Sequence, residues 1–268
     1  NTWSYIWASV PGGANKVISK QAGYGWNLVL SIPDVYYFDF PYQVDPKERG
    51  YKWASRQTNT RNVFNFMPDN VPVHAEFRTD TQNLPFEVND TLQKDEQGKV
   101  VHQPLPANYK VKGIQGQLWS ETVRGESQAE YMVYPRMFAL AERAWHEASW
   151  EVPYDANGKV YNQSTSVFSE ELKQQRDNDW QGFANTLGQK ILPKLDKAGI
   201  FYRIPTVGAA IIDGKLNVNQ ALPGLTIEFK QNDGNWAQYT TPVDVTGEVL
   251  VRARSADGKR AGRTLVVK

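Results

Sequence analysis

Residues 113–121 form the segment that most restricts the fold of this 268-residue chain. The segment is short, apolar and glycine-containing, as buried strands are, and it ends in Trp119, Ser120 and Glu121 instead of a turn residue. Parallel α/β barrels keep their active sites at the carboxyl ends of their strands. The ending therefore indicates a functional site, and the alternative is a core strand with a packed Trp119 and a solvated Glu121.

Two earlier segments also have the pattern of strands. Residues 2–9 alternate with period two and are rich in aromatics, whereas residues 27–32 form the continuous apolar run of a fully buried parallel strand. The second run continues through a Pro-Asp pair, so we expect a strand over residues 27–40 that ends in tyrosines and an acid. The candidate site residues at the three strand ends are Trp7, Tyr37, Asp39, Trp119 and Glu121.

Helices and long loops connect and follow these strands. Residues 41–106 are polar, with Pro and Asn breakers, and predict long loops with short helical pieces. Apolar residues recur every three or four positions over residues 126–146, which indicates an amphipathic helix in which Pro135 marks a kink or a restart. Ser169 is the candidate N-cap of a long helix, and Gly199 ends that helical region.

The last part of the chain has a different pattern. From about residue 206, short alternating runs are separated by Asp-Gly and Asn-Asp-Gly-Asn turn signals, which predicts a small β-sandwich. A sandwich of roughly 65 residues has a marginal core unless it docks on a neighbour. We therefore expect two domains, one over residues 1–200 and a β-sandwich over residues 201–268.

Composition makes several kinds of partner unfavourable. Thirty basic and 29 acidic side chains leave a formal charge of +1, so no strong field attracts nucleic acid or an anionic membrane surface. The chain has no cysteine, and no apolar run approaches the ~20 residues of a membrane span. His74, His102 and His146 lie far apart without metal-ligand spacing, and we interpret them as surface or loop residues. We expect neither a metal nor a cofactor.

The chain is rich in aromatic residues, with nine Trp, thirteen Tyr and eleven Phe. Aromatic rings at several strand ends, with two carboxylates between them, suit a pyranose ring, because stacking holds the ring and acids accept hydrogen bonds from its hydroxyls. Trp53, in the loop after the second strand, is a candidate for a further wall. The alternative is that these rings only pack the core and, for Trp53, the loop.

Four motifs follow one another along the chain. They are Tyr37-Phe38-Asp39; Gly116-Gln117-Leu118-Trp119-Ser120-Glu121; Tyr134-Pro135-Arg136 with Ala141-Glu142-Arg143-Ala144-Trp145; and Pro193-Lys194-Leu195 with Tyr202-Arg203-Ile204-Pro205. The strand ending in Trp-Ser-Glu and the helix with Ala-Glu-Arg-x-Trp, in that order, are the specific pair. In these motifs, and over essentially its whole length, the chain resembles the β-N-acetylhexosaminidases of glycoside hydrolase family 20, in particular the bacterial chitobiases.

The resemblance implies a fold class. Residues 2–9, 27–40 and 113–121 would be strands six, seven and eight of the family's (β/α)8 barrel, and residues 206–268 would be the immunoglobulin-like domain that ends chitobiases. The expected fold is therefore α/β, the C-terminal part of a TIM barrel followed by a small immunoglobulin-like β-sandwich. The family also implies a bacterial periplasmic, cell-surface or secreted location.

The chain departs from the family at the general acid. In the family this acid is the Glu of an adjacent Asp-Glu pair in a His-x-Gly-Gly-Asp-Glu context, which no segment here matches, since Asp95-Glu96 lies in a polar turn. A barrel of ~250 residues also cannot close on three strands. We therefore expect this chain to be the C-terminal portion of an enzyme whose N-terminal part carries the acid, and to be inactive without that partner.

The resemblance also implies an activity and residue roles. The activity is retaining release of terminal N-acetylglucosamine from chitooligosaccharides, in which the substrate's own acetamido oxygen attacks the anomeric carbon. Tyr37 would donate a hydrogen bond to the acetamido group, while Asp39 and Glu121 would hold the hydroxyls of the non-reducing end. The rings expected to enclose the sugar and its acetamido methyl are Trp7, Trp53 and Trp119. The alternatives are a non-catalytic carbohydrate-binding protein and a structural or adhesive role.

Overall fold

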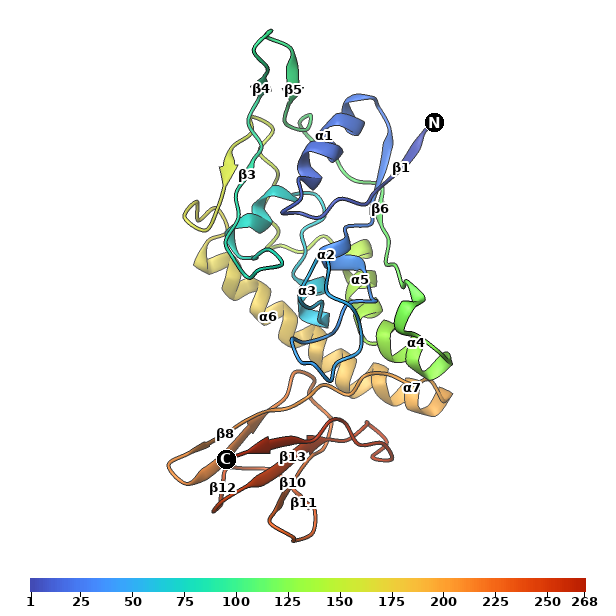
Figure 1. The fold of residues 1–268 in the computed structure, drawn as a ribbon, viewed down its shortest axis with the longest axis vertical. Helices are drawn as coiled ribbons and strands as arrows, with labels where there is room; N and C mark the ends of the chain where they lie inside the picture. The colour runs from blue at the N-terminus through green and yellow to red at the C-terminus, as the bar shows by residue number, and fades with distance from the viewer. The chain divides into compact units, whose positions relative to one another are not determined.

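The structure, a computed structural model, describes residues 1–268 and contains two compact units. The first unit comprises residues 1–124 and 136–177, and the second comprises residues 125–135 and 178–268. Figure 1 shows a mixed α/β chain in which helices dominate the middle and strands the C-terminal part.

A three-stranded parallel sheet lies in the first unit. Its strands are β1 (Trp3–Ile6), β2 (Asn27–Leu30) and β6 (Gly113–Ile114), in the order β1-β2-β6. Leu28 and Leu30 of β2 are fully buried, as their continuous apolar run predicts. In β1 the buried Ile6 alternates with exposed Tyr5 and Trp7 on either side, which is the expected period of two. The three predicted strands, and their parallel arrangement, are confirmed.

The second and third strands are shorter than predicted. The prediction of one strand over residues 27–40 is wrong after residue 30, because β2 ends at Leu30 and the chain then forms the short helix α2 (Pro33–Tyr36). Pro33 fixes φ near its helical value at the first helical position, and the buried Asp34 accepts a hydrogen bond from Val10 N–H at 3.1 Å. Pairing resumes as a single parallel bridge between Tyr37 and Gln117.

The strand predicted over residues 113–121 also ends early. The named strand β6 stops at Ile114, and residues Ser120–Thr122 form a short 3-10 helix, η2. Trp119 and Glu121 therefore lie beyond the strand, not within it. They still follow the carboxyl end of the sheet, because the bridge between Tyr37 and Gln117 extends the ladder almost to Trp119.

Residues 41–106 are long loops with short helical pieces, as predicted. The helical pieces are α3 (Thr60–Phe64), which Asn59 caps, and the 3-10 helix η1 (Pro72–Glu76). The sequence pattern does not predict the short strands of this region. They are β3 (Val88–Asn89), which pairs with β7 (Val160–Tyr161), and β4 (Gln93–Lys94), which pairs with β5 (Val100–His102).

α1 (Ala14–Gly23) contacts β1 and β2.

The helices around Pro135 and after Ser169 begin and end where the sequence predicts. Pro135 separates α4 (Glu126–Val133) from α5 (Arg136–Trp145), so the predicted restart is confirmed. Ser169 caps α6 (Glu170–Thr186) by accepting Leu172 N–H at 3.3 Å. The run continues as a π-helix, η3 (Leu187–Ile191), and as α7 (Leu192–Ala198), which Gly199 ends at φ 74°. No helix is long and apolar enough to cross a membrane.

The C-terminal strands form two antiparallel sheets in the second unit. One sheet has the order β11-β10-β13-β14 and the other β12-β9-β8. The strands are β8 (Gly208–Ile212), β9 (Lys215–Asn219), β10 (Ile227–Gln231), β11 (Ala237–Gln238), β12 (Val243–Asp244), β13 (Val249–Ala253) and β14 (Leu265–Val267). Asp213 and Gly214 turn β8 into β9 with φ of 50° and 74°, as the Asp-Gly signal predicts. The predicted β region and its hairpin turn are confirmed.

Candidate functional site

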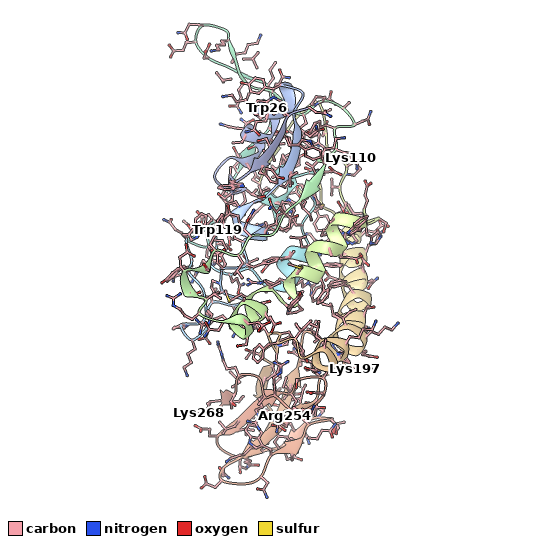
Figure 2. The ribbon with its side chains drawn as sticks, turned by 90° about the vertical axis from the view of Figure 1, so that its right-hand side faces the viewer. Trp26, Lys110, Trp119, Lys197, Arg254 and Lys268 are labelled. Carbon is pink, nitrogen blue, oxygen red and sulfur yellow. The ribbon has the colours of Figure 1, made fainter.

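Four of the predicted aromatic residues meet at the carboxyl end of the parallel sheet. The ring centroids of Trp7 and Trp119 are 5.9 Å apart, those of Tyr37 and Trp119 are 5.9 Å apart, and those of Tyr37 and Trp53 are 5.6 Å apart. We call these four residues the aromatic cluster. Figure 2 labels Trp26 just before β2, at the amino end of the sheet, and Trp119 beyond the other end.

The backbone around the cluster explains why these rings converge. Trp7 follows β1 directly, and Tyr37 follows α2. Phe38 N–H donates to the Gln117 carbonyl at 2.6 Å, and Gln117 N–H donates to the Tyr36 carbonyl at 2.9 Å. These two bonds hold the segment that carries Tyr37 beside the segment that carries Trp119, although about 80 residues separate them in sequence.

Exposure differs sharply within the cluster. Tyr37 is 3% exposed, whereas Trp7 is 56%, Trp53 is 55% and Trp119 is 39% exposed. Large exposed indole rings gathered around a buried tyrosine are a surface that a flat apolar ligand face can cover. The arrangement therefore offers stacking surface together with a polar group beneath it.

The surroundings of Tyr37 favour the protonated form of its hydroxyl. Burial raises its pKa, the indole N–H of Trp119 donates to it and lowers the pKa in part, and the nearby Asp39 charge raises it again. A raised pKa keeps the phenol protonated at neutral pH. The group can therefore donate its proton in a hydrogen bond to a carbonyl oxygen.

Asp39 is a buried acid with unused acceptor capacity. It is 5% exposed, and its Oδ1 accepts no hydrogen bond in the structure. Burial raises the pKa of its carboxyl, two backbone N–H groups, its own and that of Trp119, lower it, and the Glu121 charge raises it. The structure thus places the two predicted acids within electrostatic reach of each other. A buried oxygen without a donor is costly, and a ligand hydroxyl would satisfy it.

Comparisons with known protein families support the resemblance seen in the sequence. The model described as glycosyl hydrolase family 20, catalytic domain, matches residues 1–148. The chain belongs to glycosyl hydrolase family 20. A second model, described as the chitobiase/beta-hexosaminidase C-terminal domain, matches residues 191–264.

Three of the relatives that the chain resembles are bacterial proteins. The chain is 40% identical to an N,N'-diacetylchitobiase of Vibrio harveyi, over the whole chain and 28% of that protein. It is 39% identical to a β-hexosaminidase of Vibrio vulnificus, over 98% of the chain and 30% of that protein. It is 49% identical to a β-hexosaminidase B of Pseudoalteromonas piscicida, over 64% of the chain and 21% of that protein. The predicted bacterial chitobiase type is confirmed, and the chain spans less than a third of each relative.

In this family 20 chain, two residues adjoin the site without having been predicted there. The Phe40 ring lies 5.2 Å from that of Trp53 and 6.4 Å from that of Tyr37. Arg49 Nη1 donates to the Thr122 carbonyl at 2.5 Å and so joins the loop after the second strand to the segment of Glu121. The place of Phe40 just after Tyr37 and Asp39 is a local signal for it. No local signal points to Arg49, because Thr122 lies 73 residues away.

The interpretation of the histidines is wrong for two of the three. His74 is fully buried, and its Nε2 accepts Met67 N–H at 3.0 Å. His102 is also buried, with its Nε2 3.0 Å from Asp90 Oδ1. His146 is exposed, as expected, at the end of α5. No group of three or more His, Cys, Asp or Glu side chains is arranged to hold a metal ion.

Proposed function

We propose that this chain forms part of a β-N-acetylhexosaminidase that releases terminal N-acetylglucosamine from chitooligosaccharides. The observation that carries this proposal is the buried Asp39, with a carboxylate oxygen that has no donor, two residues from the buried Tyr37, whose ring contacts the exposed rings of Trp53 and Trp119. An N-acetylated pyranose offers the matching groups, which are hydroxyls, an acetamido carbonyl and an apolar ring face. The names of the bacterial relatives agree with this activity.

The residues would divide the work as follows. The acetamido oxygen of the substrate attacks the anomeric carbon while the glycosidic C–O bond breaks, and the leaving oxygen takes a proton from a general acid. Tyr37 donates a hydrogen bond to the acetamido group and steadies the cyclic oxazolinium ion. Asp39 and Glu121 accept hydrogen bonds from the hydroxyls of the non-reducing end. The rings that enclose the sugar are Trp7, Trp53 and Trp119.

We place the general acid in an N-terminal part of the same enzyme. The one adjacent Asp-Glu pair of this chain lies in the turn between β4 and β5, where Asp95 Oδ1 accepts the N–H groups of Gln97 and Lys99. Glu96, the residue of this pair that would be the acid, is exposed in the same turn, outside the strand ends that carry the aromatic cluster, whereas a general acid must reach a leaving group. The parallel sheet in turn would be strands six to eight of a (β/α)8 barrel that the N-terminal part completes.

The remaining parts of the proposal follow the family. Residues 1–200 would be the barrel portion with its long loops and closing helices, and residues 201–268 an immunoglobulin-like sandwich. Two antiparallel sheets, in which β14 contacts β8, support a sandwich. The enzyme would work in the bacterial periplasm, on the cell surface or as a secreted protein.

The replacement Tyr37→Phe in the complete enzyme tests the activity and the role of the hydroxyl. Turnover of a chromogenic N-acetylglucosaminide should fall about 10²–10³-fold, because one preorganised donor is lost while the ring is kept. Tyr36→Phe is the matched control. The Tyr36 hydroxyl is also buried but makes no hydrogen bond in the structure, so its loss should leave turnover unchanged. Normal turnover in Tyr37→Phe would contradict the role.

The same assay separates the alternative of a carbohydrate-binding protein without catalysis. That alternative shares the aromatic cluster and Asp39, and it predicts saturable binding of N-acetylglucosamine by the complete protein without hydrolysis. A structural or adhesive role predicts neither binding nor hydrolysis. Steady turnover by the complete protein, together with the loss in Tyr37→Phe, is expected only of the hydrolase.

A further inference from the structure

Arg136 is a fully buried arginine at the start of α5, and it binds the backbone that carries the site. Its Nη1 donates to the carbonyl oxygens of Phe40 and Thr58, both at 2.8 Å, and its Nη2 donates to the carbonyl oxygen of Phe38. A buried guanidinium is costly unless many hydrogen bonds compensate its desolvation. Hydrogen bonds to three main-chain carbonyl oxygens therefore help to compensate the buried positive charge of Arg136.

Two of those carbonyls flank Asp39. The Phe38 carbonyl belongs to the peptide unit that precedes Asp39, and the Phe40 carbonyl belongs to the unit between Phe40 and Pro41. Because one rigid planar group binds both, the backbone before and after Asp39 cannot rotate freely. The guanidinium carbon also lies 5.1 Å from the ring centre of Phe38 and 3.9 Å from that of Tyr42, which holds its plane in place. Arg136, at the start of α5, thereby fixes the direction in which the Asp39 side chain leaves the backbone.

A glycine, Gly50, also approaches the same backbone closely. Gly50 has φ +124°, and a Cβ there would lie 2.4 Å from the Asp39 carbonyl oxygen and 2.7 Å from Pro41 N. Tyr51 N–H donates to the same Asp39 carbonyl at 3.3 Å. The loop can approach this closely only because residue 50 has no side chain. Three residues later the loop supplies Trp53 to the cluster.

We propose that Arg136 and Gly50 are positioning residues that clamp residues 38–40, so that the Asp39 carboxylate and the Tyr37 hydroxyl face the bound sugar. Neither residue touches the substrate. This inference rests on the proposed function. A positioning role differs from a purely structural role in one respect. Small changes at Arg136 or Gly50 should alter the turnover of enzyme that remains folded.

The replacement Arg136→Lys in the complete enzyme tests the clamp. An ammonium group is a point charge and cannot bind all three carbonyls in the fork geometry, so kcat should fall at least about tenfold in enzyme that remains folded. Arg143→Lys is the matched control. Arg143 is a buried arginine of the same helix that pairs with Glu151 at 3.0 Å and lies over the ring of Phe64. It should lower the melting temperature and leave kcat unchanged.

A second pair of variants tests the clamp at Gly50. Gly50→Ala should lower kcat and weaken binding of N-acetylglucosamine, because the new methyl group pushes the loop off the Asp39 carbonyl. Gly25→Ala is the control, since Gly25 also has positive φ, +73°, but nothing lies within 4 Å of its added Cβ. If Arg136→Lys prevents folding, the glycine pair still decides the question.

Three results would bear differently on the proposals. Unchanged kcat in Arg136→Lys or in Gly50→Ala would overturn the clamp. Losses of kcat in Arg143→Lys and Gly25→Ala equal to those in their partners would also overturn it, because they would show a general effect of stability. If the unmodified complete enzyme hydrolyses nothing, the proposed function is contradicted instead. The clamp is then tested by measuring how tightly the same variants bind N-acetylglucosamine.

Discussion

Asp39 is a residue of the site whose charge depends on its surroundings. Burial raises the pKa of its carboxyl above the usual 3.8, and the Glu121 charge adds to the increase. Backbone N–H groups and Arg136 act in the other direction but do not cancel it. Only the ionised carboxylate is a strong acceptor for sugar hydroxyls. Sugar binding through Asp39 is therefore present above the raised pKa and is lost as the pH falls through it.

This sign gives a prediction for ligand binding. The dissociation constant of the complete enzyme for N-acetylglucosamine should rise on the acid side, and the rise should begin at a higher pH than an exposed aspartate would give. Asp39→Asn should bind more weakly at neutral pH and should show a smaller acid-side change. Titration calorimetry from pH 7 to pH 4 measures both. The same pH dependence in the two proteins would show that Asp39 does not govern binding.

Local patterns predict side chains at strand ends, and they do not predict residues that act from a distance. Trp7, Tyr37 and Trp119 each follow a recognisable apolar segment, and the structure brings their rings together. No local pattern predicts the contacts of Arg136, because its bonds to Phe38 and Phe40 span 98 and 96 residues. The interpretation of His74 as a surface or loop residue is wrong for the same reason. Its burial, which lowers its pKa to about 3, depends on chain segments that no local pattern joins.

At the scale of elements, the sequence predicts where helices begin and end better than what interrupts them. Ser169 and Gly199 mark the two ends of the long helical run correctly. The π-helix η3 inside that run has no local sequence signal, and another part of the chain approaches it closely. A Cβ at Gly188 would lie 1.7 Å from the Pro223 carbonyl oxygen. The backbone of the loop between β9 and β10 therefore occupies the place of a side chain.

Gly188→Ala should consequently destabilise the second unit. The added methyl group must displace the backbone at Pro223, which costs about 1–3 kcal/mol by overpacking. Gly182→Ala is the control within α6, because nothing lies within 4 Å of its added Cβ. It should stabilise the helix by about 0.5–1 kcal/mol, the usual gain of alanine over glycine. Thermal unfolding should show opposite shifts, and equal shifts would contradict the packing argument.

At the scale of the whole molecule, the parallel sheet has two open edges. β1 and β6 each pair only with β2, so the outer edge of each carries unpaired backbone groups. Parallel sheets in α/β proteins are normally covered and continued on both sides. Trp3 and Tyr5 of β1 are also about half exposed. The sequence anticipated this incompleteness, because only three barrel-type strand segments could be found.

Hydrogen exchange can test whether an N-terminal part of the enzyme completes this sheet. In the chain alone, amides of β1 and β6 that face the outer edges should exchange quickly, whereas amides of β2, which is paired on both sides, should be protected. Combining the chain with the N-terminal part should slow exchange in β1 and β6, because new strands would pair with both edges, and should restore hydrolysis. Exchange in β10 and β13 serves as the internal reference, since both strands are already paired with two neighbours. Unchanged exchange in β1 and β6 after combination, or full activity of the chain alone, would contradict a barrel shared between the two parts.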